Sequence, residues 1–345
     1  MSYLHLADKT KLKGVQYGSS NSTSGEVVFS TGMTGYVETF TDPSFAGQIL
    51  VCTYPLIGNY GVPDSSFFES KKIHLKGVIV SELALSYSHS DAHQSIDSWL
   101  KKEGVPLLAG IDTRALTKKL REHGAILGAI SSSEKPIVFD DPNTRNLVAD
   151  VSPSEVTIHG DGPICIIAID CGMKENIVRS LTRPNVTLKR VPWNYDIANE
   201  QYDALFISNG PGDPTQCSKT VHSIKNAMKQ NKPILGICLG NQLLALAAGG
   251  ATYKLSYGHR GQNQPCIDTE TGRCYITSQN HGFAVKSDSL PEDWKVWFTN
   301  ANDNSVEGIK HTDAPWRSVQ FHPEAAPGPT DTAWIFDEFL ASLQK

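Results

Sequence analysis

Apolar runs in the second half of the chain alternate with stretches of helical pattern, and this alternation constrains the fold more than any other feature. The apolar runs cover residues 164–170, 186–191, 204–208 and 233–237. The helical stretches are expected near 174–182, at 218–230 and at about 331–343. Strands that are apolar throughout are typical of a mostly parallel sheet with helices on both faces. In such a sheet, ligands bind beyond the carboxyl ends of the strands.

The first part of the chain has a different pattern, in which short β-branched or aromatic runs alternate with Gly/Ser turns. Two helices are predicted there, at 91–103 and 113–123, each followed by a glycine that suits a helix C-terminus. Large apolar clusters then become rare, and Ser, Pro, Asp and Asn become frequent. We therefore predict a smaller β-rich α/β domain over 1–140, a linker over 141–163 and a second α/β domain over 164–345.

Composition excludes several classes of protein. Of the 345 residues, 39% are hydrophobic and 19% charged, and the formal net charge is −5, which suits a folded soluble protein. The chain has no long Lys/Arg run, so we expect no nucleic-acid partner, and no apolar stretch reaches the ~20 residues that span a membrane. The seven cysteines are scattered and never form a C-x-x-C pair, which argues against a disulfide framework or a metal site. Because the first nine residues lack the features of a targeting segment, we expect a cytoplasmic protein.

One cysteine stands where a nucleophile would be expected. Cys238 lies between glycines 236 and 240, directly after the apolar run 233–237 and before a helical segment. A nucleophile on a sharp strand-to-helix turn needs small neighbours because its backbone is strained. The N–H groups at the helix N-terminus would also favour a thiolate. The alternative is a buried core cysteine without chemistry, and these five residues do not decide between the two.

A catalytic cysteine needs a base, and the base needs an orienting group. The run 318–322 is predicted to be a strand that ends at His322, and Glu324 follows two residues later. Taken singly, His322 could be a structural histidine and Glu324 a solvated loop carboxylate. Their position at another strand end of the same α/β domain favours a base and its orienting group.

Two further polar segments could complete a site. In the turn at 208–214, backbone N–H groups near Gly210 and Gly212 could hold a substrate or an oxyanion, with the N–H of Leu239 as the other donor. Residues 279–283 form a polar cluster at the end of a strand. Each segment could equally be an ordinary turn.

Together these motifs resemble those of the triad-type (class I) glutamine amidotransferases. The segments that carry the resemblance are 236–242, 322–324 and 209–214. Other segments are similar to the small subunit, or fused glutaminase domain, of carbamoyl-phosphate synthetase: 31–36, 41–44, 53–61 and 279–285. The resemblance covers about residues 10–343. It is specific, because the glutaminases of anthranilate and GMP synthases lack such an N-terminal domain.

The resemblance implies roles for particular residues. Cys238 would be the nucleophile, His322 the general acid and base, and Glu324 the carboxylate that orients it. L-glutamine would lie against the positions that match the family's pocket, which are Ser44, Gly210, Gly212, Leu239, Gln242, Asn280, Gly282 and Phe283. The inclusion of Ser44 implies that the first domain contributes to the pocket. Glutamine hydrolysis would need no metal or other cofactor.

One position departs from the family pattern. Asn241 stands where His is common, and since Asn can still form hydrogen bonds, we expect altered contacts around the site and retained activity. A branch of the carbamoyl-phosphate family that lacks the triad cysteine has no glutaminase activity, and Cys238 excludes that branch here.

The resemblance implies hydrolysis of L-glutamine through a γ-glutamyl thioester. The ammonia would go to a carbamoyl-phosphate synthetase, as a large subunit or a fused domain, which uses it with bicarbonate, ATP and Mg²⁺. The lack of a targeting segment favours pyrimidine biosynthesis over a mitochondrial arginine-related pathway. Two alternatives remain open, which are a non-catalytic regulatory or assembly subunit and a γ-glutamyl hydrolase that acts alone.

Overall fold

The computed structural model describes residues 1–135 and 137–344. Residue 136 of the first predicted domain and residue 345 of the second lie outside the described residues. The chain divides into two compact units. The first contains Met1–Thr144 and Ser256–Arg260, and the second contains Arg145–Leu255 and Gly261–Lys345. The short segment 256–260, which no sequence pattern singles out, therefore belongs to the unit formed by the beginning of the chain.

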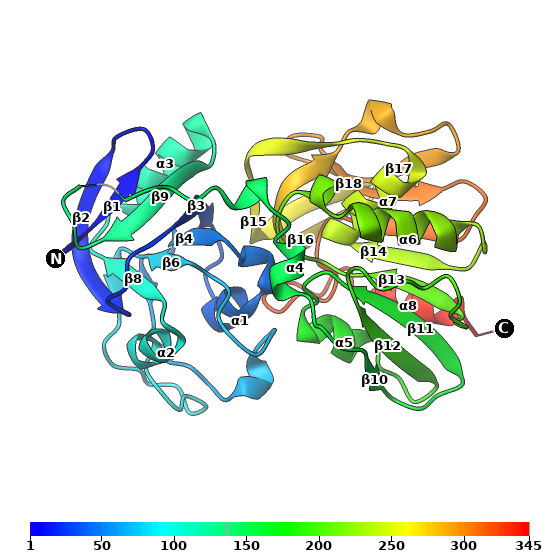
Figure 1. The fold of residues 1–345 in the computed structure, drawn as a ribbon, viewed down its shortest axis with the longest axis horizontal. Coiled ribbons are helices and arrows are strands. Elements are labelled where there is room, and N and C mark those ends of the chain that lie inside the picture. The colour runs from blue at the N-terminus through cyan, green and yellow to red at the C-terminus, as the bar shows by residue number, and fades with distance from the viewer. Residues whose placement is uncertain (136, 345) are drawn as a thin grey trace. The chain divides into compact units, whose positions relative to one another are not determined.

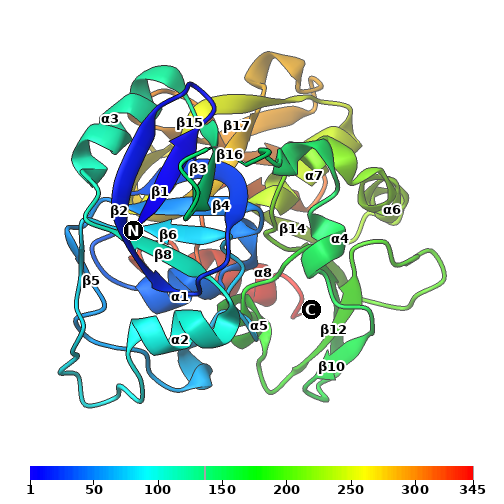
Figure 2. The same ribbon diagram turned by 60° about the vertical axis from the view of Figure 1, so that its left-hand side comes forward.

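The first unit is built around a closed barrel with the strand order β1-β2-β8-β6-β4-β3-β9 (Figure 2). Neighbours from β3 through β4 and β6 to β8 pair in parallel, and the other neighbours pair antiparallel. The strands are β1 (Ser2–Leu6), β2 (Lys11–Gly18), β3 (Thr23–Ser30), β4 (Gln48–Cys52), β6 (Gly77–Ile79), β8 (Pro106–Ala109) and β9 (Ile126–Ser131). A separate pair consists of β5 (Leu56–Ile57) and β7 (Glu82–Leu83). The prediction of a β-rich α/β domain is confirmed.

The helices of the first unit are α1 (Tyr36–Thr41), α2 (Ile96–Glu103) and α3 (Thr113–His123). Helix α3 has the predicted bounds. Helix α2 begins later than the predicted helix 91–103, because the Ser95 hydroxyl accepts a hydrogen bond from the Ser98 N–H and caps the helix there. Both helices end at glycines with positive φ, Gly104 and Gly124.

The second unit contains a ten-stranded sheet with the order β10-β12-β11-β13-β14-β19-β18-β16-β15-β17 (Figure 1). The strands are β10 (Thr157–His159), β11 (Ile164–Asp170), β12 (Val186–Pro192), β13 (Ala204–Ile207), β14 (Ile234–Ile237), β15 (Thr252–Asp268), β16 (Cys274–Val285), β17 (Trp294–Asn300), β18 (Val306–His311) and β19 (Trp316–Val319). Strands β12, β11, β13 and β14 run parallel, as the apolar runs predict, and β19 is parallel to β14 as well. The sheet continues beyond β19 with antiparallel strands, which those runs do not predict.

Helices cover both faces of the parallel strands. They are α4 (Val148–Val151), α5 (Glu175–Leu181), α6 (Ser218–Met228), α7 (Leu239–Ala248) and α8 (Trp334–Ala341). Along β11, Ile167 packs in the cluster that includes α6 and α7, whereas Ile166 packs in the cluster that includes α5 and α8. Successive residues thus enter opposite cores, which explains why the strand is apolar throughout.

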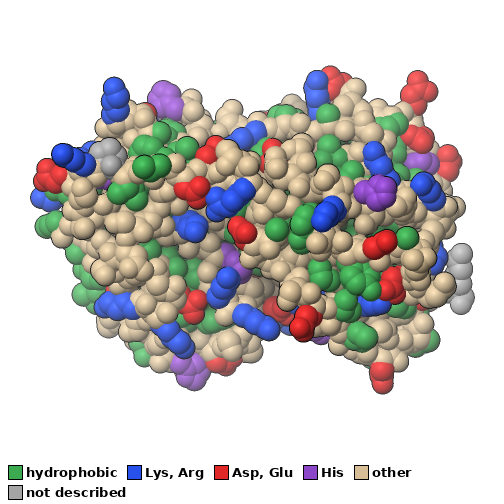
Figure 3. All heavy atoms as spheres, in the orientation of Figure 1, with side chains coloured by type: hydrophobic (Ala, Val, Ile, Leu, Met, Phe, Trp, Pro, Cys, Tyr) green, Lys and Arg blue, Asp and Glu red, His purple; other side chains and the backbone are tan. Residues whose placement is uncertain are grey.

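The distribution of charged side chains and the lengths of the helices agree with the composition, which shows no long basic run and no long apolar stretch. Basic and acidic side chains are interspersed over the face shown in Figure 3. Within residues 1–135 and 137–344, no helix is both long enough and apolar enough to span a lipid bilayer.

Candidate active site

Cys238 occupies a strained turn between β14 and α7. Its backbone has φ 54° and ψ −102°, a region that non-glycine residues rarely adopt. A Cβ on Gly236 would lie 2.7 Å from the Gly240 carbonyl, and one on Gly240 would lie 2.2 Å from the Ile207 oxygen. The Cys238 N–H donates to the Val319 carbonyl (2.8 Å), which fixes the turn to the neighbouring strand. The predicted strand-to-helix turn with small neighbours is confirmed.

His322 and Glu324 form a buried pair in the loop after β19. The strand ends at Val319, so the prediction that residues 318–322 form one strand is wrong at its end. The chain leaves its parallel neighbour there, because the His322 N–H donates to the Ser278 carbonyl. His322 Nδ1 lies 2.6 Å from Glu324 Oε1, and the two side chains are 2% and 0% exposed. Nδ1 is thus held by the carboxylate, while Nε2 has no hydrogen-bond partner among the residues described.

The imidazole of His322 is a buried titratable group whose ring is held by Glu324. Burial by itself would lower the pKa of His322, but the Glu324 carboxylate and the Cys238 thiol outweigh it and raise that pKa to about 10. His322 therefore carries a proton at neutral pH that it can give to a leaving group.

Lys174 is a site residue that the sequence reasoning missed. It precedes α5, its Nζ lies 3.1 Å from Glu324 Oε1, and its side chain is 3% exposed. Nζ also donates to the Ala325 carbonyl, where the backbone has a positive φ of 55°. Burial by itself would raise the pKa of Glu324, but Lys174 and His322 outweigh it and lower that pKa to about 2. The available signal was a lysine just beyond the carboxyl end of the apolar run 164–170.

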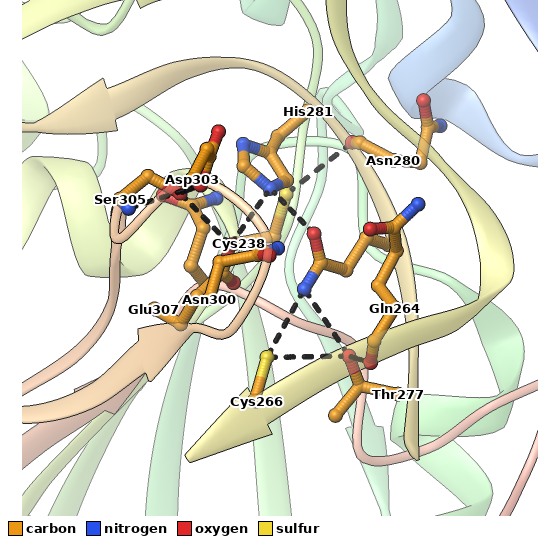
Figure 4. Close-up of polar contacts among 12 residues, drawn as sticks. Cys238, Gln264, Cys266, Thr277, Asn280, His281, Asn300, Asp303, Ser305 and Glu307 are labelled. Carbon is orange, nitrogen blue, oxygen red and sulfur yellow. Dashed lines mark hydrogen bonds and ion pairs between the residues drawn. The ribbon is translucent and has the colours of Figure 1, made fainter. Parts of the chain in front are cut away.

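The structure brings several of the predicted pocket residues close to Cys238. Asn280, on β16, has its carbonyl 3.5 Å from the Cys238 Sγ (Figure 4). Leu239 is the first residue of α7, and a Cβ on Gly210 would lie 2.8 Å from its Cδ2. The turn after β13 and the start of α7 are therefore adjacent, as the proposed cradle requires.

For the remaining predicted pocket residues, the structure gives a position on or next to an element of the fold. Gln242, in the first turn of α7, donates from Nε2 to the Phe283 carbonyl on β16 (2.9 Å). Gly282 lies between Asn280 and Phe283 on the same strand, and Gly212 follows β13 with φ 84°. Ser44 lies in the first unit, in the short helix η1 (Pro43–Phe45), where its N–H donates to the Asp42 carboxylate (2.9 Å). Its contribution to the pocket stays a prediction.

A second buried histidine, His281, lies on the same strand β16 and was not assigned a role from the sequence (Figure 4). His281 Nδ1 lies 2.9 Å from the Phe283 carbonyl, and its Nε2 lies 3.2 Å from Gln279 Oε1. The same Nε2 lies 3.7 Å from Glu307 Oε1 on β18. Glu307 comes from a strand about 25 residues further along the chain, a pairing that no local pattern indicates.

Comparisons with known proteins agree with the geometry. Residues 167–342 match the family "Glutamine amidotransferase class-I", and residues 4–130 match "Carbamoyl-phosphate synthase small chain, CPSase domain". The "Multifunctional protein CAD" of Squalus acanthias is 51% identical over 99% of this chain and 16% of its own length. The "Multifunctional protein pyr1-3" of Dictyostelium discoideum is 49% identical over 99% of this chain and 17% of its own. The "Carbamoyl phosphate synthase arginine-specific small chain" of Yarrowia lipolytica is 48% identical over 96% of this chain and 80% of its own.

Proposed function

The chain belongs to the class I glutamine amidotransferases of the carbamoyl-phosphate synthase small-chain type, and on this premise we propose that it hydrolyses L-glutamine at Cys238. The products are glutamate and ammonia. The observation that carries the proposal is the orientation of His322, whose Nδ1 is held by Glu324 while its Nε2 is left for the thiol.

In the first half of the reaction, the Cys238 thiolate attacks the side-chain amide carbon of glutamine and a tetrahedral oxyanion forms. The N–H of Leu239 and the backbone of the turn at Gly210 are the groups placed to stabilise that oxyanion. The carbon–nitrogen bond then breaks as His322 transfers its proton to the nitrogen. Ammonia leaves, and a γ-glutamyl thioester remains on Cys238.

In the second half, water replaces ammonia. His322, now neutral, takes a proton from the water as the oxygen attacks the thioester carbon. The carbon–sulfur bond breaks, glutamate leaves, and the thiolate and the imidazolium are restored. Throughout, Glu324 holds the ring, and Lys174 neutralises the carboxylate from the other side.

We further propose that the ammonia is passed to a carbamoyl-phosphate synthetase, either a separate large subunit or a fused domain. The chain spans only 16% and 17% of the two multifunctional relatives, and the names of the relatives include both multifunctional proteins and a small chain. The synthetase would use the ammonia with bicarbonate, ATP and Mg²⁺, as part of pyrimidine or arginine biosynthesis. A cytoplasmic location belongs to the same proposal.

Measurement of glutamate release from L-glutamine tests the function, with the synthetase present and absent. We expect release by the wild type and none by Cys238→Ala, and mass spectrometry of acid-quenched enzyme should detect the γ-glutamyl adduct on the peptide with Cys238. Cys165→Ala is the matched control, because Cys165 is a half-buried thiol on β11 outside the site.

The alternatives give different results. A non-catalytic assembly subunit would release no glutamate under either condition, which would contradict the proposal. A γ-glutamyl hydrolase acting alone would be fully active without a synthetase and would cleave γ-glutamyl peptides better than glutamine.

A further inference from the structure

A buried chain of side-chain amides links the helix that follows Cys238 to the segment that carries His322. The Ser318 hydroxyl donates to Asn241 Oδ1 (2.9 Å), and Asn241 Nδ2 donates to Gln320 Oε1 (3.2 Å). Gln242 Nε2 donates to the same Gln320 oxygen (3.1 Å). The four residues are at most 3% exposed. Buried polar groups linked in this way hold one another in a single orientation.

The backbone decides the direction of these hydrogen bonds. The Phe283 carbonyl can only accept, so the amide of Gln242 must present its nitrogen there (2.9 Å). The same nitrogen uses its second proton on Gln320 Oε1. Both donor positions of Gln242 are therefore occupied by the protein, and only its oxygen remains available to a ligand.

Gln320 keeps its orientation although this leaves its own nitrogen without a partner. Its Nε2 is buried and forms no hydrogen bond with any residue in the described ranges, a loss of about 1–3 kcal/mol for such a group. Rotating the amide by 180° would turn this nitrogen toward Asn241 Nδ2 and Gln242 Nε2, which are both donors. Gln320 is thus held as an acceptor for its two neighbours.

The oxygen of Gln242 differs from the unsatisfied atom of Gln320. Gln242 Oε1 accepts no hydrogen bond from the described residues. Unlike Gln320 Nε2, it is not fully buried, so a ligand could reach it. Gln242 lies four residues after Cys238, and its side chain reaches the strand whose Asn280 carbonyl faces the thiol. The Gln242 oxygen is therefore a hydrogen-bond acceptor between α7 and β16, the two elements next to Cys238.

We propose that Gln320 and Asn241 are positioning residues that hold Gln242 with its oxygen toward the substrate, so that the site selects a free α-ammonium group. This rests on the proposed hydrolysis of L-glutamine. The α-ammonium is the one cationic donor of that substrate, and it lies at the end opposite the reacting amide. A rigidly held acceptor discriminates strongly against analogues that lack the donor.

The test compares L-glutamine with glutaramate, which has the same amide and carboxylate but no α-amino group. Gln320→Leu frees Gln242 to rotate, and we expect it to raise the KM for L-glutamine at least about tenfold. The kcat/KM for glutaramate, measured as ammonia release at high enzyme concentration, should stay at the wild-type value. Gln320→Glu keeps an acceptor oxygen and should restore most of the affinity for L-glutamine.

A second readout needs no turnover. Calorimetry measures the dissociation constants of L-glutamine and glutaramate for the Cys238→Ala variant and for the double variant that also carries Gln320→Leu. The matched control is Thr220→Val, which removes the hydrogen bond from another fully buried side chain of the same unit to the Trp193 carbonyl (2.7 Å). It should lower the melting temperature and leave both substrates unaffected.

Equal losses on the two substrates in Gln320→Leu would show a merely structural role and overturn the inference, as would no loss on either. A wild-type protein without Cys238-dependent glutamate release would instead overturn the proposed function, so the two failures can be told apart.

Discussion

Two buried histidine–glutamate pairs of the second unit differ in how well their geometry suits acid–base chemistry. In the first, His322 Nδ1 lies 2.6 Å from Glu324 Oε1, and in the second, His281 Nε2 lies 3.7 Å from Glu307 Oε1. Both pairs are almost fully buried. Residue types and burial therefore do not explain the difference between them.

The first difference lies in the other ring nitrogen. His281 Nδ1 faces the Phe283 carbonyl and its Nε2 faces Gln279 Oε1, so each nitrogen meets an acceptor and none is left to take a proton. Among the residues that the structure describes, only the Nδ1 of His322 has a hydrogen-bond partner, and its Nε2 is available to the thiol. A histidine can serve as a base only where the protein leaves one nitrogen unoccupied.

The second difference lies in the partners of the carboxylate. Glu324 accepts from the ammonium of Lys174 (3.1 Å), and the contacts of Glu307 include Asn300 (3.3 Å) and Ser305 (3.5 Å). A cation holds the carboxylate ionised whether or not the histidine is charged. Glu324 can thus keep orienting His322 while the ring loses and regains its proton.

The largest expected effect separates the two histidines. His322→Gln should lower kcat for glutamine hydrolysis by about 10³-fold, because the general acid and base is lost. His281→Gln should act mainly on KM, since it disturbs the Phe283 carbonyl that also binds Gln242. Steady-state kinetics of the two variants decide the matter. A loss of kcat in His281→Gln as large as in His322→Gln would remove the distinction between the pairs.

Lys174→Met should have the next largest effect. It leaves a buried carboxylate without its cation, and we expect a loss of about 3 kcal/mol of unfolding free energy. The kcat should fall as well, with partial recovery in Lys174→Arg. Denaturant unfolding and glutaminase kinetics measure the two effects. The control is Lys189→Met, which removes the partly exposed pair with Glu200 (2.7 Å). Equal stability of the two methionine variants would contradict the role assigned to Lys174.

Glu307→Gln should have a smaller effect, confined to stability. The amide fits the same space and keeps an oxygen for Asn300 and Ser305, so we expect a loss of about 1 kcal/mol and an unchanged kcat. Thermal unfolding and kinetics at saturating glutamine provide the check. A clear fall in kcat would mean that the Glu307 carboxylate also acts on the reaction.

A further expected effect is the pH dependence of stability. The pKa of Glu324 is lowered from 4.5, so its contribution is complete above pH 4.5 and is lost as the pH falls toward 2. The pKa of His322 is raised from 6.5, so its contribution is complete below pH 6.5 and is lost as the pH rises toward 10. Melting temperatures from pH 6 to 10 should therefore fall more steeply in the wild type than in His322→Asn. Parallel curves would contradict the raised pKa.

The sequence predicted what local patterns encode. The turn at Cys238 was predictable because strand, thiol, glycines and helix are consecutive, and the parallel strands because burial on both faces leaves a continuous apolar run. Lys174 was missed because a single lysine after a strand is usually a solvated side chain. The pairing of His281 with Glu307 was missed because it depends on the register between β16 and β18. The antiparallel continuation of the sheet was not predicted, because the partly exposed residues of β15 and β16 give no continuous apolar run.

The segment 256–260 has a consequence for how such a protein can be divided. Its carbonyls at Ser256 and Arg260 accept from the N–H groups of Ala125 (2.8 Å) and Thr31 (3.1 Å), and the Tyr257 ring stacks on Phe29. The chain therefore passes between the two units three times, after residues 144, 255 and 260. A single recombination near residue 144 cannot exchange the first unit as a whole, because five of its residues are encoded more than a hundred codons downstream. Gene fusion or domain shuffling in such a protein has to carry both units together.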